Sequence, residues 1–216
     1  ASVTSEGIVT NTLGTSNFVA GVNAGNSITS GGNYNTVVGD EAGTAITTGD
    51  NNTAVGMSAL DANTTASNNT AMGYAALTAN TTGAGNSAMG GSSLEANTTG
   101  NSNVAVGKDT LKANTTASNN TALGRSALLS NTTGAYNTAI GTYSLYTNTT
   151  ASNNTANGYN ALFYNTTGAS NVALGTSALQ SNTTAANNTA VGTYSLYRNT
   201  TGANNTSVGY NSLFDN

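Results

Sequence analysis

The chain has 216 residues, of which only 33 are Leu, Ile, Val or Phe, while Gly, Asn, Thr, Ser and Ala dominate. Only 12 side chains are charged, four basic and eight acidic, so the chain lacks both the high net charge of disordered proteins and the basic surface that nucleic-acid binding requires. Cys and His are absent, which excludes disulfides, thiolate metal sites and histidine-based acid–base catalysis, and no apolar run approaches the roughly 18 residues that span a membrane.

The first 50 residues carry a sequence repeat in a weak form. Segments 11–14 and 46–49 both occupy a position that reads Asn-Thr-Thr-Gly in later units. Asn17 and Asn35 lie one position further apart than the equivalent Asn residues of later units, and an extra residue in a turn does not change the face that a strand presents. We therefore interpret residues 1–50 as less regular N-terminal coils of one repeat array.

A regular 17-residue unit fills residues 51–216. Its consensus is N-T-A-φ-G-x-x-A-L-x-x-N-T-T-G/A-x-x, where φ is apolar. The first Asn recurs once in every unit from Asn35 to Asn205, a glycine follows it four positions later, and a leucine recurs from Leu60 to Leu213. No linker interrupts the array, so we expect one continuous domain.

The repeat predicts an all-β parallel β-solenoid of about 12–13 coils. A helical repeat would need a sustained 3.6-residue period, whereas each unit here holds a glycine, β-branched pairs and two Asn-centred turn signals. One short coil cannot bury its own apolar face, but coils stacked at ~4.8 Å bury a continuous core. The predicted rod is about 60 Å long.

Alternation along a strand assigns side chains to two faces. In the strand predicted around residues 52–56, Thr53 and Val55 share one side and Ala54 faces the other. The file of residues equivalent to Thr53 also contains Val and Phe, so we expect Thr53 and Val55 to face the interior. We expect either a tight solenoid wall or a second chain to crowd the Ala54 file, with Leu60 filling the core from the opposite wall.

The repeated Asn side chains allow two interpretations. Amides stacked at turns form a ladder by bonding from coil to coil. Alternatively, the Asn-Thr-Thr segments are N-glycosylation acceptors. The acceptor Asn residues of this set are Asn63, Asn80, Asn97, Asn114, Asn131, Asn148, Asn165, Asn182 and Asn199. A second set with the acceptor pattern comprises Asn51, Asn68, Asn119, Asn153, Asn187 and Asn204.

Aromatic residues gather in the C-terminal half of the chain. The position after each repeated leucine is polar in early coils and becomes Leu129, Tyr146, Phe163, Tyr197 and Phe214 later. Because this file follows an inward leucine, we expect it to face outward as a contact surface, either for glycans or proteins or for lateral packing in an oligomer. Tyr143 and Tyr194 extend the same surface, and segments 142–165 and 193–216 match closely.

The files of threonine suggest ice binding as a further alternative function, because regularly spaced hydroxyls on a flat solenoid face can order water in an ice-like lattice. Ice-binding solenoids usually show a Thr-x-Thr strand, whereas Thr64 and Thr65 are adjacent and point to opposite faces. For catalysis, neither a carboxylate pair in a cleft nor a serine beside a base is visible. We expect no enzymatic activity and no cofactor.

Residues 103–107 and 171–175 read N-V-A-V-G and N-V-A-L-G. They resemble the N-x-V-A-I-G motif of head repeats in trimeric autotransporter adhesins. The longer unit is similar to repeats of phage tail-fibre-like and bacterial surface proteins that end in an endosialidase-type chaperone. The resemblance implies a left-handed parallel β-roll, commonly trimeric, that is displayed outside the cell for attachment.

These patterns predict a structural or adhesive fibre segment located outside the cell, on a cell or virion surface. Both ends of the chain fall within a repeat and lack a polar capping unit, so we expect continuation in a longer protein or end-to-end stacking. The expected partners are further copies of the chain, as a homotrimer or a filament, and glycans or a host surface. The alternative is a glycan- or ice-binding solenoid that acts through an aromatic or Thr-rich face.

Overall fold

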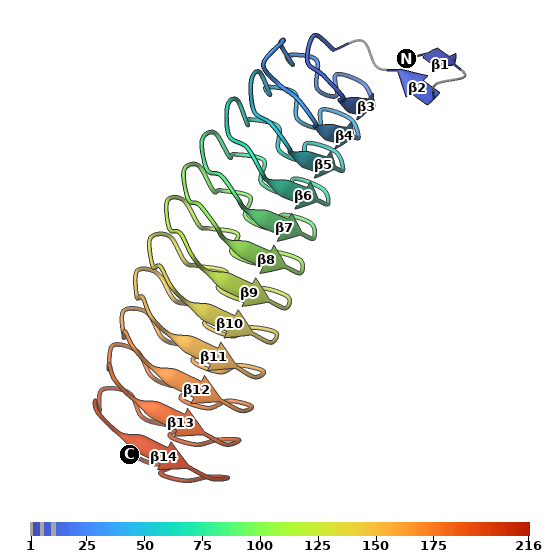
Figure 1. The fold of residues 1–216 in the computed structure, drawn as a ribbon. Helices are drawn as coiled ribbons and strands as arrows, with labels where there is room; N and C mark the ends of the chain where they lie inside the picture. Colours follow the sequence, from blue (N-terminus) through green and yellow to red (C-terminus); the bar gives the residue numbers. More distant parts are fainter. Residues whose placement is uncertain (1, 5–6, 10–11) are drawn as a thin grey trace.

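The chain forms a curved rod of stacked coils (Figure 1), as seen in a computed structural model that describes residues 2–4, 7–9 and 12–216. Twelve parallel three-residue strands form one sheet that runs the length of the rod. This arrangement confirms the predicted all-β solenoid with 17-residue coils, in about 11 turns. The strands are β3 Phe18–Ala20, β4 Thr36–Val38, β5 Thr53–Val55, β6 Thr70–Met72, β7 Ser87–Met89, β8 Val104–Val106, β9 Thr121–Leu123, β10 Thr138–Ile140, β11 Thr155–Asn157, β12 Val172–Leu174, β13 Thr189–Val191 and β14 Thr206–Val208.

The register of the sheet follows the sequence repeat. Each strand pairs with the strands of the coils before and after it, and equivalent positions lie opposite each other, as Ala105 does with Ala122. The step from strand to strand equals the repeat length everywhere except between β3 and β4, where Phe18 pairs with Thr36 and the step is longer by one position. The predicted extra residue between Asn17 and Asn35 is therefore confirmed, and it is accommodated without a change of strand face.

The first residues do not belong to the solenoid sheet. Strands β1 (Ser2–Thr4) and β2 (Gly7–Val9) pair antiparallel in a separate two-stranded sheet. The expectation that all of residues 1–50 form solenoid coils is thus wrong for this segment. Its β-branched residues favour strands, but it carries none of the repeated Asn, Gly and Leu positions that close a coil. The first Asn-Thr-Thr-Gly-like segment, 11–14, lies partly outside the described residues.

The strand faces are the reverse of the sequence prediction. Ala54 and its equivalents point inward and are buried, together with the files of Ala59 and Leu60, whereas Thr53 and Val55 lie on the outer surface and are only partly covered. The physical reason is the width of the core. A leucine and an alanine from the opposite wall already fill it, so the inward strand position takes a small side chain. The solenoid wall itself crowds the Ala54 file.

The corner that carries the leucine has an unusual backbone. Leu60 and its equivalents through Leu213 have φ between 48° and 57°, in the left-handed region that non-glycine residues seldom occupy. Two short turns flank this residue, with Ala59 N donating to Gly56 O and Asn63 N donating to Leu60 O. The tight corner turns the leucine into the core and the next residue outward.

Glycine is required where each strand ends. Gly124 has a φ of +130°, and a Cβ there would lie 2.7 Å from the carbonyl carbon of Gly141 in the next coil. Both the backbone conformation and the contact with backbone therefore exclude a side chain. The equivalent glycines from Gly39 to Gly192 meet the next coil in the same way.

Two buried files of Asn hold neighbouring coils together. In the file of Asn63, each amide from Asn80 onward donates to the Asn one coil earlier. Asn114 Nδ2, for example, donates to Asn97 Oδ1 at 2.8 Å and to Ala117 O at 3.0 Å. In the file of Asn52, the side-chain oxygen accepts a backbone N–H from the next coil, as Asn103 Oδ1 does from Asn120 N at 3.0 Å. The predicted Asn ladder is confirmed, and the second file satisfies backbone groups instead.

Candidate functional site

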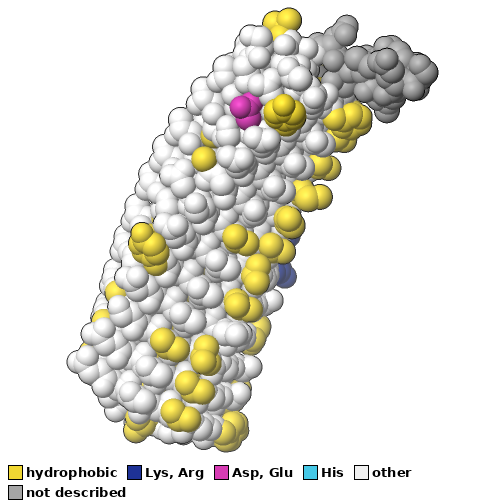
Figure 2. Space-filling view, viewed as in Figure 1, with side chains coloured by type: hydrophobic (Ala, Val, Ile, Leu, Met, Phe, Trp, Pro, Cys, Tyr) yellow, Lys and Arg dark blue, Asp and Glu magenta, His cyan; other side chains and the backbone are white. Residues whose placement is uncertain are grey.

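The outer face of the sheet carries two parallel files of side chains, those of Thr53 and Val55. The Val55 file holds apolar residues that remain partly exposed, including Met89 at 41% and Val106 at 37%. Figure 2 shows hydrophobic side chains forming a band along one edge of the rod, with few charged side chains on the visible face. Asn157 is the polar member of this file. The outer sheet face is thus a long, nearly uncharged surface.

The predicted contact file is half-buried along its length. Leu129, Tyr146, Phe163, Tyr197 and Phe214 are all intermediate in exposure, so they do not form the fully exposed stripe expected from the sequence. The Tyr146 and Phe163 rings stack with centroids 4.9 Å apart and an interplanar angle of 10°. The Tyr197 and Phe214 rings stack at 4.9 Å and 20°. Stacking from coil to coil covers one face of each of these rings.

Each stacked pair belongs to a four-ring cluster. We call Tyr143, Tyr146, Tyr159 and Phe163 the first aromatic cluster. Its central ring is Tyr143, which makes edge contacts with Tyr146 at 5.5 Å, Tyr159 at 6.3 Å and Phe163 at 6.3 Å. Tyr164 adds a fifth ring by an edge contact with Phe163 at 4.7 Å. The cluster draws two rings from each of two consecutive coils.

A second aromatic cluster, formed by Tyr194, Tyr197, Tyr210 and Phe214, reproduces the first three coils later. Its central Tyr194 makes edge contacts at 5.4, 6.4 and 6.3 Å with Tyr197, Tyr210 and Phe214. Sequence reasoning identified Tyr143 and Tyr194 but missed Tyr159 and Tyr210, which occupy the first position after the repeated glycine. The matching of segments 142–165 and 193–216 was the signal that could have found them.

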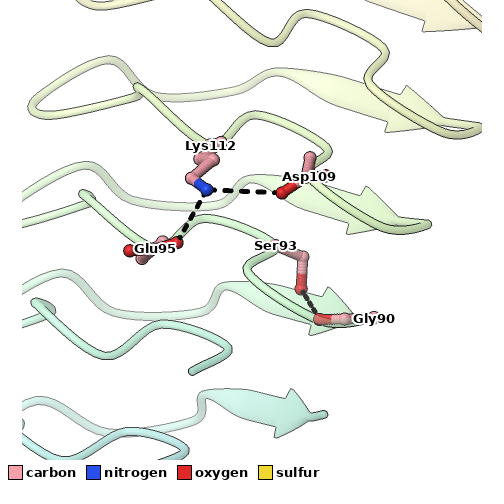
Figure 3. A network of polar contacts seen from close by, with 5 residues as sticks. All are labelled: Gly90, Ser93, Glu95, Asp109 and Lys112. Atoms are coloured by element: carbon pink, nitrogen blue, oxygen red, sulfur yellow. Dashed lines mark hydrogen bonds and ion pairs between the residues drawn. The ribbon is translucent and has the colours of Figure 1, made fainter. Parts of the chain in front are cut away.

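Five charged side chains of the described residues form ion pairs. Lys112 contacts Glu95 at 3.3 Å and Asp109 at 3.4 Å, and in a neighbouring coil Ser93 donates to Gly90 O (Figure 3). The hydrogen bond to Glu95 raises the pKa of Lys112.

Near the aromatic clusters, the cations lie against rings. Arg125 lies 5.9 Å from the centre of the Tyr143 ring. Arg198 pairs with Asp215 at 2.9 Å and lies 5.4 Å from the centre of the Phe214 ring. The exposed ion pair between Arg198 and Asp215 contributes little to stability.

The predicted glycosylation acceptors are not accessible in the folded chain. All nine Asn residues from Asn63 to Asn199 are fully buried, and from Asn80 onward each amide nitrogen donates within the ladder. A glycan attaches at this nitrogen, so the buried geometry contradicts the acceptor interpretation for the folded rod. The second set, such as Asn119, is exposed at turns with positive φ, a conformation that Asn tolerates well. Turn geometry therefore explains why Asn recurs at the positions of the second set, without any need for glycosylation.

The adjacent threonines have different surroundings. Thr64 and its equivalents donate their hydroxyls to a backbone carbonyl in the next coil, as Thr115 Oγ1 does to Thr132 O at 3.2 Å. Thr65 and its equivalents are exposed. On the outer sheet face, Thr53 lies beside apolar Val55, so the strands present a Thr-x-apolar pattern.

Comparison with known proteins found no matching family model, no matching curated protein and no matching solved structure. Across the described residues, no helix has the length and apolar character needed to cross a membrane. Within the same part of the chain, no group of three or more His, Cys, Asp or Glu side chains is arranged to hold a metal ion. The site must therefore be interpreted from its own chemistry, as two aromatic clusters and an outer sheet face on a repetitive all-β solenoid.

Proposed function

We propose that this chain is a rod-like segment of an extracellular fibre, on a cell or virion surface, that serves structure and attachment. The observation that carries the proposal is the uninterrupted stack from β3 to β14, in which every coil uses the same contacts with its neighbours. A stack of this kind holds a fixed length and direction, which a spacer in a fibre requires. The proposed role needs no catalysis and no cofactor.

Self-association of the rods is part of this proposal. The outer sheet face is long, periodic and nearly uncharged, and its apolar side chains, such as Met89 and Val106, remain partly exposed. Exposed apolar surface of this extent favours an interaction site. A second copy of this chain offers the same coil spacing, so apolar side chains on parallel rods meet in register along the full length. We infer lateral packing of identical rods through this face, with a homotrimer as the expected closed form.

The test places like charges on the outer sheet face. Purified wild-type rods and the M89E/V106E double variant are compared by analytical ultracentrifugation and negative-stain imaging. We expect wild-type rods to associate side by side and the variant to sediment as single rods, because carboxylates on a shared apolar face lose solvation and repel each other.

A matched control separates the face from the added charge. The T99E/T116E variant adds the same charges to the same pair of neighbouring coils, at exposed turn positions away from the sheet. It should associate as the wild type does. Wild-type rods that stay single at high concentration, or equal loss of association in both variants, would refute packing through this face.

A further inference from the structure

The two aromatic clusters are equivalent in geometry as well as in composition. The centroid distances from the central ring are 5.5, 6.3 and 6.3 Å in the first cluster and 5.4, 6.4 and 6.3 Å in the second. The clusters are separated by three coils, which corresponds to about 14 Å along the rod at the usual strand spacing. Two like sites at a fixed spacing on one line suit a ligand whose chemistry repeats along its length.

One ring of each cluster is open to solvent. Tyr159 is 51% exposed and Tyr210 is 73% exposed, whereas the stacked rings beside them are half-buried. Both tyrosines meet their central ring in a T-shaped contact, at interplanar angles of 66° and 71°. Among the described residues no ring stacks parallel to either of them, and their exposure leaves ring surface open to a ligand.

The surface between the two open rings is polar and uncharged. Tyr159, Thr176, Thr193 and Tyr210 occupy the same position in four consecutive coils, so the two threonines lie between the tyrosines. Within the described part of the chain the hydroxyls of Thr176 and Thr193 make no hydrogen bond. Hydroxyls flanked by aromatic faces match sugars, whose rings offer C–H groups to stack on an aromatic ring and hydroxyls to bond between them.

We propose that Tyr159 and Tyr210 are the two stacking subsites of one binding site for a linear, uncharged glycan that lies along the rod, with Thr176 and Thr193 contacting the sugars between them. The inference rests on the attachment role proposed above and names its ligand class. A protein partner fits less well because the two equivalent open rings, Tyr159 and Tyr210, stand three coils apart, and the nearby charges are already engaged: Arg198 with Asp215, and Arg125 with a ring. Because both subsites lie on one rigid element, binding at one raises the effective concentration at the other.

The test uses neutral gluco-, manno- and xylo-oligosaccharides, each as a disaccharide and an octasaccharide, titrated against the whole chain. We expect at least one octasaccharide to bind more tightly than its disaccharide, because only the longer chain reaches both rings. Each of Y159A and Y210A should weaken octasaccharide binding about tenfold, and the double variant should remove the advantage of length. Y159F and Y210F keep the ring and should keep binding.

Y74A and Y136A serve as controls, because Tyr74 is 59% exposed in the same position of an earlier coil and Tyr136 is 62% exposed at a turn, both outside the clusters. They should bind as the wild type does. The absence of binding by every oligosaccharide, or equal losses in controls and cluster variants, would overturn the proposal. If Y159A/Y210A instead changes the sedimentation of the rods, the clusters are protein contacts and the glycan assignment is wrong. Normal assembly without glycan binding would refute this inference and leave the fibre role standing.

Discussion

Asn114 offers a direct test of the buried Asn ladder. Its side chain is fully buried, donates to Asn97 Oδ1 at 2.8 Å and Ala117 O at 3.0 Å, and accepts from Asn131 Nδ2 at 3.0 Å. Asn114→Asp keeps the shape but replaces two N–H donors by a carboxylate that faces two oxygen acceptors. Burial and these acceptors disfavour the charged form, so we expect the folded-state pKa of the new Asp to rise far above its ordinary value near 3.9.

The magnitude follows from the cost of keeping that carboxyl protonated. At pH 7, holding neutral a group whose unfolded pKa is about 3.9 costs about 4 kcal/mol. The neutral carboxyl has one donor where the amide had two, which removes about 1 kcal/mol more. We expect Asn114→Asp to lose about 5 kcal/mol of unfolding free energy at pH 7 and only about 1 kcal/mol at pH 3. Stability is present below the unfolded pKa and falls as pH rises toward the folded pKa.

Urea unfolding followed by circular dichroism at pH 3 and pH 7 measures this change, and hydrogen exchange shows whether the coils around residue 114 open first. The matched control is Asn119→Asp, which adds the same charge in the same coil at an exposed turn. Asp tolerates the positive φ of this position, so the control should lose little at either pH. Equal losses in the two variants at pH 7, or an Asn114→Asp variant whose stability does not depend on pH, would show that the ladder does not hold the coils.

Three further predictions concern the core, the strand end and the charges. In urea unfolding, Leu111→Ile should destabilise the rod by about 1–2 kcal/mol more than Leu111→Met, because a β-branched residue fits poorly at a φ of 51°. Equal losses of stability in the two variants would contradict a role for the left-handed backbone at Leu111. Gly124→Ala should lower the unfolding temperature and open the neighbouring coils to hydrogen exchange, because the added alanine Cβ meets the backbone of Gly141. An unchanged unfolding temperature would contradict the close contact between the two coils at this position. Lys112 has a raised pKa, so its contribution to the stability of the rod is complete at neutral pH and disappears as pH rises through the folded-state pKa. Between neutral pH and pH above 10, a Lys112→Met variant should therefore lose less unfolding free energy than the wild type.

The repeat alone predicts the coil length, the register and the inward leucines, because stacking forces equivalent residues into files. The strand faces were not predictable by hydrophobicity, since Val55 is more apolar than Ala54 and yet lies outside. What decides is volume: a core already filled by Leu60 and Ala59 leaves space only for a small residue on the strand. The same limit on side-chain volume applies near the end of the rod, where the small residue Ser207 takes the place of Ala. Ser207 is buried, and its hydroxyl lies 2.8 Å from that of Ser195.

The candidate site was only partly predictable from the sequence, because the repeat places residues in files but does not show which files contact each other. The stacked rings follow the inward leucine, so the leucine period could find them. Tyr159 and Tyr210 instead follow the strand-end glycine, and they join the clusters through contacts with Tyr143 and Tyr194. Each cluster takes two rings from one coil and two from the next, so copying a single coil could not reproduce it. The second cluster repeats the first after three whole coils, with its geometry retained. Coils that contact only their neighbours can be duplicated in blocks without disturbing the core, so the outward files are free to change while the rod remains the same.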